Sequence, residues 1–179
     1  MQTFRLITTE KKIRLLEGFL YEPEGKIRLR QLAGRLGVNA GYASTFMKKM
    51  ENAGLISKGR LNIGDPRIRA LRMVFNIDKL ASCWPELKKH GILGVGVFGS
   101  WAHGANTRAS DLDVWVKTAK EPGVEEASRL REIFRKRAAV SEISLIVITP
   151  KSMAEMKAKD AIFYSSLLNS FHLGGEWLD

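Results

Sequence analysis

One stretch, Phe98–Val116 (FGSWAHGANTRASDLDVWV), restricts the fold and the chemistry of this chain more than any other. Gly99 and Ser100 directly follow an apolar run, and Asp111 and Asp113 begin a second one. This order predicts a strand, a Gly-Ser turn, a short helix, a loop and another strand. Alternate side chains of a strand share a face, so the two aspartates should point the same way, about 7 Å apart along the chain. Two parallel carboxylates predict a site for a divalent cation.

The positive charge is confined to the first half of the chain. Residues 1–90 contain 18 Lys and Arg against 8 Asp and Glu, whereas residues 91–179 contain 11 of each, so the net charge of +10 belongs to the first half. Such a basic segment is typical of modules that contact polyphosphate, and a solvated basic face without a partner is the alternative.

Composition also bears on the compartment and on the single thiol. No apolar run reaches the 18 residues of a membrane span, and the start of the sequence lacks a signal-peptide apolar region. We therefore expect a cytoplasmic protein with no membrane partner. The single Cys83 excludes an internal disulfide, and its apolar neighbours predict a buried, inert thiol.

Helical periodicity and capping residues predict three helices in the basic half. The first begins at Thr8 or Thr9, runs to about Tyr21 and is ended by Pro23 and Gly25; the second covers 29–36; the third is capped by Asn39 and ends before Gly54. A short Gly-containing turn between the last two helices is the helix-turn-helix pattern.

The sequence LRQLAGRLGVNAGYASTFMKKMENAGLIS resembles the winged helix-turn-helix of prokaryotic DNA-binding domains, over about residues 8–75. In that fold the third helix enters the major groove, and the hydrophobic Leu55 and Ile56 begin the wing. The resemblance implies that residues 1–75 bind DNA, while a protein-docking scaffold or a solvated face is the alternative. The expected DNA-contacting residues are Tyr42, Ser44, Thr45, Lys48 and Lys49 on the third helix, with Lys58 and Arg60 in the wing.

The second half changes to strands separated by helices. Asp65 and Pro66 predict a helix over 66–75, residues 76–90 are expected to join the two halves, and the domain boundary is expected near Lys89. The expected strands cover 92–98, 112–117 and 143–148; the expected helices run from Pro122 to about Arg137, from Pro150 onward and over 161–168, with a short Gly-containing end. The predicted fold is a small α/β (α+β) domain with a mixed sheet at 90–179, preceded by a mainly α domain at 1–89.

The Gly-Ser turn and the two aspartates suit a phosphate ligand together. Gly99 lets the backbone approach a ligand closely, and Ser100 at a helix start offers a hydroxyl and free N–H groups. Mg²⁺ prefers oxygen ligands and commonly keeps substrate phosphate among them, so Asp111 and Asp113 could hold it beside the same phosphate. Ten residues separate Ser100 from Asp111, with a strand expected on each side.

With Ala102, Gly104 and Ser110, these residues follow GSxAxGxxxxxSDxDxxV, and the segment resembles the polymerase-beta superfamily of nucleotidyltransferases, especially its minimal prokaryotic branch, over roughly 91–175. The resemblance implies transfer of a nucleoside monophosphate from a nucleoside triphosphate to an acceptor hydroxyl, with two Mg²⁺ ions and release of pyrophosphate. It assigns Gly99, Ser100 and Ser110 to the nucleotide, and Asp111 and Asp113 to metal binding and catalysis.

Two departures from the family pattern bear on catalysis. His103 stands where the family usually has Arg, and Arg108 could replace that charge if the loop brings it near the nucleotide; a solvent-facing cation is the alternative. The family's third carboxylate aligns with Ser144, whereas Glu142 lies two residues earlier on the same face. Either Glu142 completes the catalytic set, or the chain is a weak or inactive transferase.

Two hypotheses follow. The first is a Mg²⁺-dependent nucleotidyltransferase, expected to move AMP, which a basic module delivers to a nucleic acid or protein acceptor. The second is a winged-helix regulator or an antitoxin-like partner of a toxin, with a nucleotide-binding domain that is weakly active or inactive. A homodimer is compatible with both.

Overall fold

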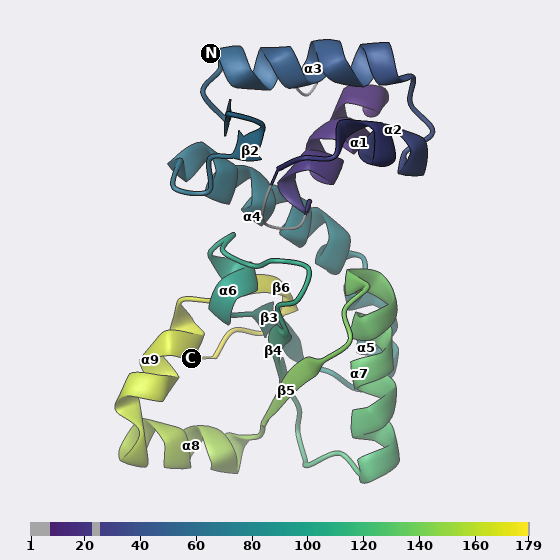
Figure 1. The fold of residues 1–179 in the computed structure, drawn as a ribbon. Coiled ribbons are helices and arrows are strands. Elements are labelled where there is room, and N and C mark those ends of the chain that lie inside the picture. Colours follow the sequence, from purple (N-terminus) through teal and green to yellow (C-terminus); the bar gives the residue numbers. More distant parts are fainter. Residues whose placement is uncertain (1–7, 23–25, 179) are drawn as a thin grey trace. The chain divides into compact units, whose positions relative to one another are not determined.

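The computed structural model describes residues 8–22 and 26–178 (Figure 1). The chain divides into two compact units, Met1–Arg72 and Met73–Asp179. Over the described ranges, no helix combines the length and the apolar character needed to cross a membrane.

The described part of the first unit consists of helices and a small hairpin. The elements are α1 (Glu10–Leu20), α2 (Leu29–Arg35), α3 (Ala40–Asn52), the antiparallel strands β1 (Ile56–Ser57) and β2 (Arg60–Leu61), and the start of α4 (Pro66–Ala81). The predicted caps are confirmed: Thr9 accepts a hydrogen bond from the Lys12 amide, and Asn39 accepts one from Gly41 at 2.8 Å. Gly54 has a φ of 76°, the left-handed conformation expected after a helix. Pro23 and Gly25 lie outside the described residues.

Apolar side chains from α1, α2, α3, the segment before the hairpin and the start of α4 form the core of this unit. Those that are fully enclosed include Leu15, Leu16, Phe19, Leu20, Leu32, Ala43, Phe46, Met50, Leu55 and Ile68. The buried Arg72 of α4 donates from Nε and Nη2 to the Leu20 carbonyl, at 3.0 and 2.8 Å. A guanidinium suits this place, because the last carbonyls of α1 carry partial negative charge.

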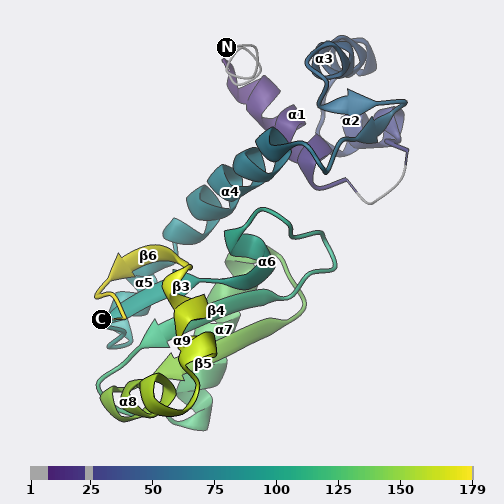
Figure 2. The ribbon, with the colours of Figure 1, turned by 90° about the vertical axis from the view of Figure 1, so that its left-hand side faces the viewer.

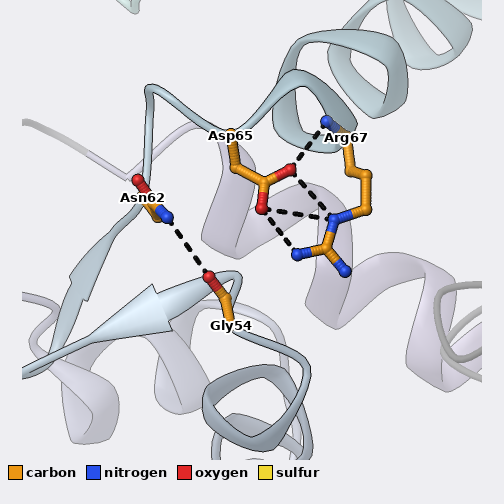
Figure 3. A network of polar contacts seen from close by, with 4 residues as sticks. All are labelled: Gly54, Asn62, Asp65 and Arg67. Atoms are coloured by element: carbon orange, nitrogen blue, oxygen red, sulfur yellow. Dashed lines mark hydrogen bonds and ion pairs between the residues drawn. The ribbon is translucent and has the colours of Figure 1, made fainter.

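A polar network fixes the start of α4 beside the hairpin (Figure 3). Asp65 accepts the backbone N–H of Arg67 at 2.9 Å and also the Arg67 guanidinium, with Nη2 at 2.6 Å from Oδ2. Asn62, just after β2, donates to the Gly54 carbonyl at 3.3 Å. The Asn62 bond ties the hairpin to the end of α3. The Asp65 cap sets where α4 begins.

The second unit is built on a four-stranded mixed sheet. Its elements are the rest of α4, α5 (Trp84–Lys89), β3 (Gly94–Val97), α6 (Gly99–Ala102), β4 (Leu112–Lys117), α7 (Val124–Ala138), β5 (Ile143–Ile148), α8 (Pro150–Lys159), α9 (Ala161–Leu168) and β6 (Phe171–Gly175). The strand order is β5-β4-β3-β6, with β4 and β5 parallel and the other pairs antiparallel. The predicted mixed sheet is therefore confirmed.

Helices cover both faces of this sheet (Figure 1). On one face, Leu87 of α5 and Leu130 and Phe134 of α7 are enclosed in a core that includes inward side chains of β3 and β4. On the other, Met153 of α8 and Leu167 of α9 pack in a second core with Trp115. These two cores fix β3 and β4. The Gly99–Ser100 turn follows the end of β3, and the two aspartates lie at the start of β4.

Two parts of the second half differ from the sequence prediction. In residues 76–90, expected to join the two halves, α4 continues to Ala81, α5 follows, and Leu80 and Leu87 are buried in the core of the second unit. The compact units accordingly divide after Arg72, before the boundary expected near Lys89. The Gly-containing end forms β6, which pairs with β3. The limits of the functional domains stay a prediction.

Candidate functional site

The Gly-Ser turn and Asp113 lie against each other at the ends of β3 and β4. Gly99 has a φ of 65°, which side-chain-bearing residues rarely adopt, and a Cβ placed there would clash with Oδ2 of Asp113. The backbone also joins them, since the Phe98 amide donates to the Asp113 carbonyl at 3.0 Å. Two separate reasons, the backbone conformation and the lack of space, therefore require glycine at position 99. Its small size brings the turn into contact with a carboxylate.

Ser100 lies in the four-residue helix α6 and is half-buried. The chain then returns through the loop 103–111 to β4 (Figure 2). The Ala105 amide donates to the Ser100 carbonyl at 2.9 Å, so the loop turns back on the start of α6. The predicted succession of strand, turn, short helix, loop and strand is confirmed.

Asp111 and Asp113 differ in their surroundings. Asp111 is exposed immediately before β4, whereas Asp113 is half-buried within it. The pKa of the Asp113 carboxyl is raised above its ordinary value. Burial is the largest cause, a hydrogen bond from Ser144 opposes the shift, and the negative charge of Asp111 adds to it. Two carboxylates that interact through charge, one of them partly desolvated, are a donor set that suits a divalent cation.

Strand β5 places Ser144 and Glu142 beside these aspartates. The parallel register pairs Leu112 with Ile143 and Asp113 with Ser144, and the Leu112 amide donates to the Glu142 carbonyl at 3.1 Å. The Glu142 side chain is exposed just before β5. Within 8–22 and 26–178, no group of three or more His, Cys, Asp or Glu side chains is placed to hold a metal ion together. The structure thus gathers two aspartates and a serine, with Glu142 one residue before the start of β5.

The remaining loop residues have separate surroundings. Ser110 accepts the Thr107 amide at 2.9 Å through its hydroxyl, and this bond closes the turn before Asp111. Arg108 is exposed on the same loop, and His103 is exposed at the C-terminal end of α6.

The residues expected to contact DNA lie in the first unit, on α3 and the hairpin. Ala43, Phe46 and Met50 form the buried face of α3. Lys58 stands at the hairpin turn with a φ of 50°, and Arg60 lies in β2. Of the candidate contact residues, Thr45, Lys48, Lys49, Lys58 and Arg60 are exposed, while Tyr42 and Ser44 are half-buried.

Sequence reasoning did not find two buried asparagines beside the candidate site. Asn106, in the loop between α6 and β4, is hydrogen-bonded to Asn76 of α4. Nothing in the sequence marks Asn76 as part of the site, because it lies in a helix far from the motif. For Asn106, the one sequence feature that could have indicated a role is its position as a polar residue inside the motif loop.

Comparison with known proteins adds one match. A family model for the nucleotidyltransferase domain matches residues 77–168, just over half of the chain, from the second part of α4 to the end of α9. No curated protein matches the chain, and no solved structure does. The matched range includes the Gly-Ser turn, both aspartates and β5. The chain belongs to the nucleotidyltransferase-domain family, whose general chemistry is nucleotidyl transfer.

Proposed function

We propose that this protein transfers a nucleoside monophosphate, AMP in the first instance, from a nucleoside triphosphate to an acceptor hydroxyl. One observation carries the proposal: the Gly99 backbone lies so close to the Asp113 carboxylate that no side chain fits between them. A turn suited to phosphate and a carboxylate suited to metal therefore meet at one place.

In this proposal the triphosphate lies against the backbone of Gly99 and Ser100, and Arg108 offers a positive charge from the loop. Asp111 and Asp113 would hold Mg²⁺, two ions in the full arrangement, which when bound neutralises phosphate charge. The acceptor oxygen forms a bond to the α-phosphorus, the bond from that phosphorus to the bridging oxygen breaks, and pyrophosphate leaves. The hydroxyl proton needs a base, and we assign this role to Glu142.

The position of Glu142 supports that assignment. Continuing the register of β4 and β5 by one residue places Glu142 opposite Asp111, and alternation puts positions 111, 113, 142 and 144 on one face. A rotation of the exposed Glu142 side chain would bring a third carboxylate toward the aspartates. If Glu142 does not act as the base, the site has only two carboxylates, because Ser144 stands at the position of the third, and turnover should be slow.

The test is transfer of label by the full chain with Mg²⁺ and each α-labelled nucleoside triphosphate, offered RNA, DNA and protein acceptors. Asp111→Ala should lower transfer by about a hundredfold or more. Glu155→Ala, which removes an exposed carboxylate on α8, is the control and should leave transfer unchanged. Glu142→Gln should slow transfer while nucleotide binding persists. Transfer that survives Asp111→Ala would sink the proposal.

We further propose that residues 1–75 are a winged helix-turn-helix module that binds DNA. The helical order, the hairpin after α3 and the basic excess of the first half support this. Lys48, Lys49, Lys58 and Arg60 are exposed and form no ion pair with any residue the structure describes, so they are available to phosphates. A regulator with a weakly active transferase domain, or an antitoxin-like protein, is the second candidate function, and the Ser144 position favours it.

A further inference from the structure

Two asparagines from distant parts of the second unit hold each other's amide groups. Nδ2 of Asn76 in α4 donates to Oδ1 of Asn106 at 2.9 Å and to the Trp101 carbonyl at 2.8 Å. Nδ2 of Asn106 donates back to Oδ1 of Asn76 at 3.5 Å. The two side chains are 1% and 0% exposed, so water does not replace these partners.

The chemistry of the pair makes each partner hard to replace. A primary amide carries a donor and an acceptor on one planar group, so two amides can satisfy each other in both directions. Removing Asn76 takes away the partners of both amide atoms of Asn106, and removing Asn106 takes one donor and one acceptor away from Asn76, which costs free energy in the closed arrangement. In addition, Asn76 bonds the carbonyl of Trp101 in α6, and so it holds both α6 and the loop that follows.

That loop, residues 103–111, connects Ser100 to Asp111 and carries Arg108. It is fastened where Ala105 bonds Ser100, where Asn106 bonds Asn76, and where Thr107 bonds Ser110. The first bond reaches only the adjoining α6, and the last lies within the loop itself. The amide pair, in contrast, ties the loop to a separate helix, and therefore sets where the loop stands relative to the rest of the unit.

We propose that Asn76 and Asn106 are positioning residues: their amide pair fixes the loop 103–111, so that the phosphate-binding turn and Asp111 are arranged before nucleotide binds. Both are too buried to touch a nucleotide themselves. The consequence for catalysis rests on the proposed function, whereas the fastening of the loop does not.

Hydrogen exchange followed by mass spectrometry tests the fastening in the full chain. In Asn76→Ala and Asn106→Ala, amides of the peptide spanning 103–111 should exchange on the order of tenfold faster, because the closed loop loses a buried hydrogen bond. The peptide over β5 is the internal reference and should not change. The double variant should add little to either single one, since the pair acts as a unit. Asn169→Ala, which removes an exposed amide bonded to the Ser165 carbonyl, is the matched control and should leave the loop unchanged.

Kinetics then separate positioning from general destabilisation. A loop that is less often closed lowers apparent nucleotide affinity, so KM for the nucleoside triphosphate should rise several-fold, with a smaller change in kcat. Saturating Mg²⁺ and nucleotide should restore slow exchange of the loop. Unchanged loop exchange in both variants, or equally faster exchange throughout the second unit, would overturn the positioning role. A wild-type chain that transfers no nucleotide contradicts the proposed function alone, since the exchange measurement does not depend on activity.

Discussion

At the residue scale, Gly99 should be the least replaceable glycine of the candidate site. Gly99→Ala introduces a side chain at a φ of 65°, which costs about 1–2 kcal/mol, and its Cβ also clashes with Asp113. We expect a lower urea midpoint together with weaker nucleotide binding. Tryptophan fluorescence reports the second unit selectively, because Trp84, Trp101, Trp115 and Trp177 all lie there.

The same substitution at Gly34 of α2 is the control, followed by helical circular dichroism because Gly34 lies in the first unit. An added Cβ there meets nothing within 4 Å and should not lower the midpoint. Adding Asp113→Ala to Gly99→Ala should recover the part of the loss caused by the clash, and leave the backbone part. A Gly99→Ala protein as stable as the wild type would show that the turn is not held as described.

The thiol of Cys83 should be inert at neutral pH. Cys83 is 0% exposed, and burial raises its pKa from 9.0 to about 11, with Arg137 opposing this shift. The folded state keeps its proton longer than the unfolded state, so this group lowers stability only as the pH rises from about 9 toward 11. Ellman's reagent at pH 8 should therefore react slowly with the native protein and rapidly in urea. Fast reaction of the native protein would show that the thiol is accessible.

At the scale of the elements, the start of α4 depends on Asp65. Asp65→Ala removes the side chain that accepts the Arg67 amide, and should lower the free energy of unfolding by about 1 kcal/mol. Asp65→Asn keeps a capping oxygen and loses the charge interaction and the Oδ2 bonds with a partly exposed guanidinium, so it should cost less. Urea unfolding followed by helical circular dichroism measures both. Equal losses in the two variants would mean that the charge matters more than the cap.

The pH dependence of this cap has a definite sign. The hydrogen bonds from the Arg67 side chain hold the pKa of Asp65 below its usual value of 3.8. Its contribution to stability is therefore present above pH 3.8 and is lost as the pH falls through the lower pKa of the folded state. The difference between the wild type and Asp65→Asn should shrink at the acid end of the titration.

How far the sequence predicts each element depends on where its stability arises. The bounds of β4, β5 and α9 agree with the prediction, because apolar runs bounded by clear turn and capping residues define them locally. β6 was missed, since Phe171–Gly175 has little strand propensity and forms through pairing with β3. The short helix α5 was also missed, because its own sequence contains Pro85 followed by mostly polar residues. Its Leu87 is held by the core of the second unit.

The candidate site shows the same division. The spacing of Gly99, Ser100, Asp111 and Asp113 is local, so the sequence places them on a turn and a strand end. The contact of Gly99 with Asp113, and the pairing of Ser144 with Asp113, depend on how β3, β4 and β5 assemble. The Asn76–Asn106 pair joins two segments with no common pattern, and only the folded unit brings them together.

At the scale of the whole molecule, charge and chemistry lie in different parts of the chain. The net charge of +10 lies in residues 1–90, whereas the turn and the aspartates lie in residues 91–179, which carry no net charge. A nucleotide is a small polyanion, and a basic excess that served only to attract it would be expected near its binding site. The excess instead suits a second and larger polyanion.

Duplex DNA is the partner that this distribution predicts, and the salt dependence of binding measures it. In Lys48→Ala/Lys49→Ala, the slope of log K against log salt should become less negative by about 2, roughly 1 for each phosphate that a lysine no longer neutralises. Fluorescence anisotropy with a labelled duplex between 50 and 200 mM salt measures this slope. Over that range, a protein with six lysine–phosphate contacts loses affinity for DNA by about 10³-fold or more. Lys151→Ala/Lys159→Ala removes two exposed lysines from α8 and is the charge-matched control, which should leave the slope unchanged. The first variant should retain nucleotide transfer, because it keeps every residue assigned to that reaction. Equal effects of the two variants on the slope would mean that DNA responds to net charge alone and that α3 is no specific binding face.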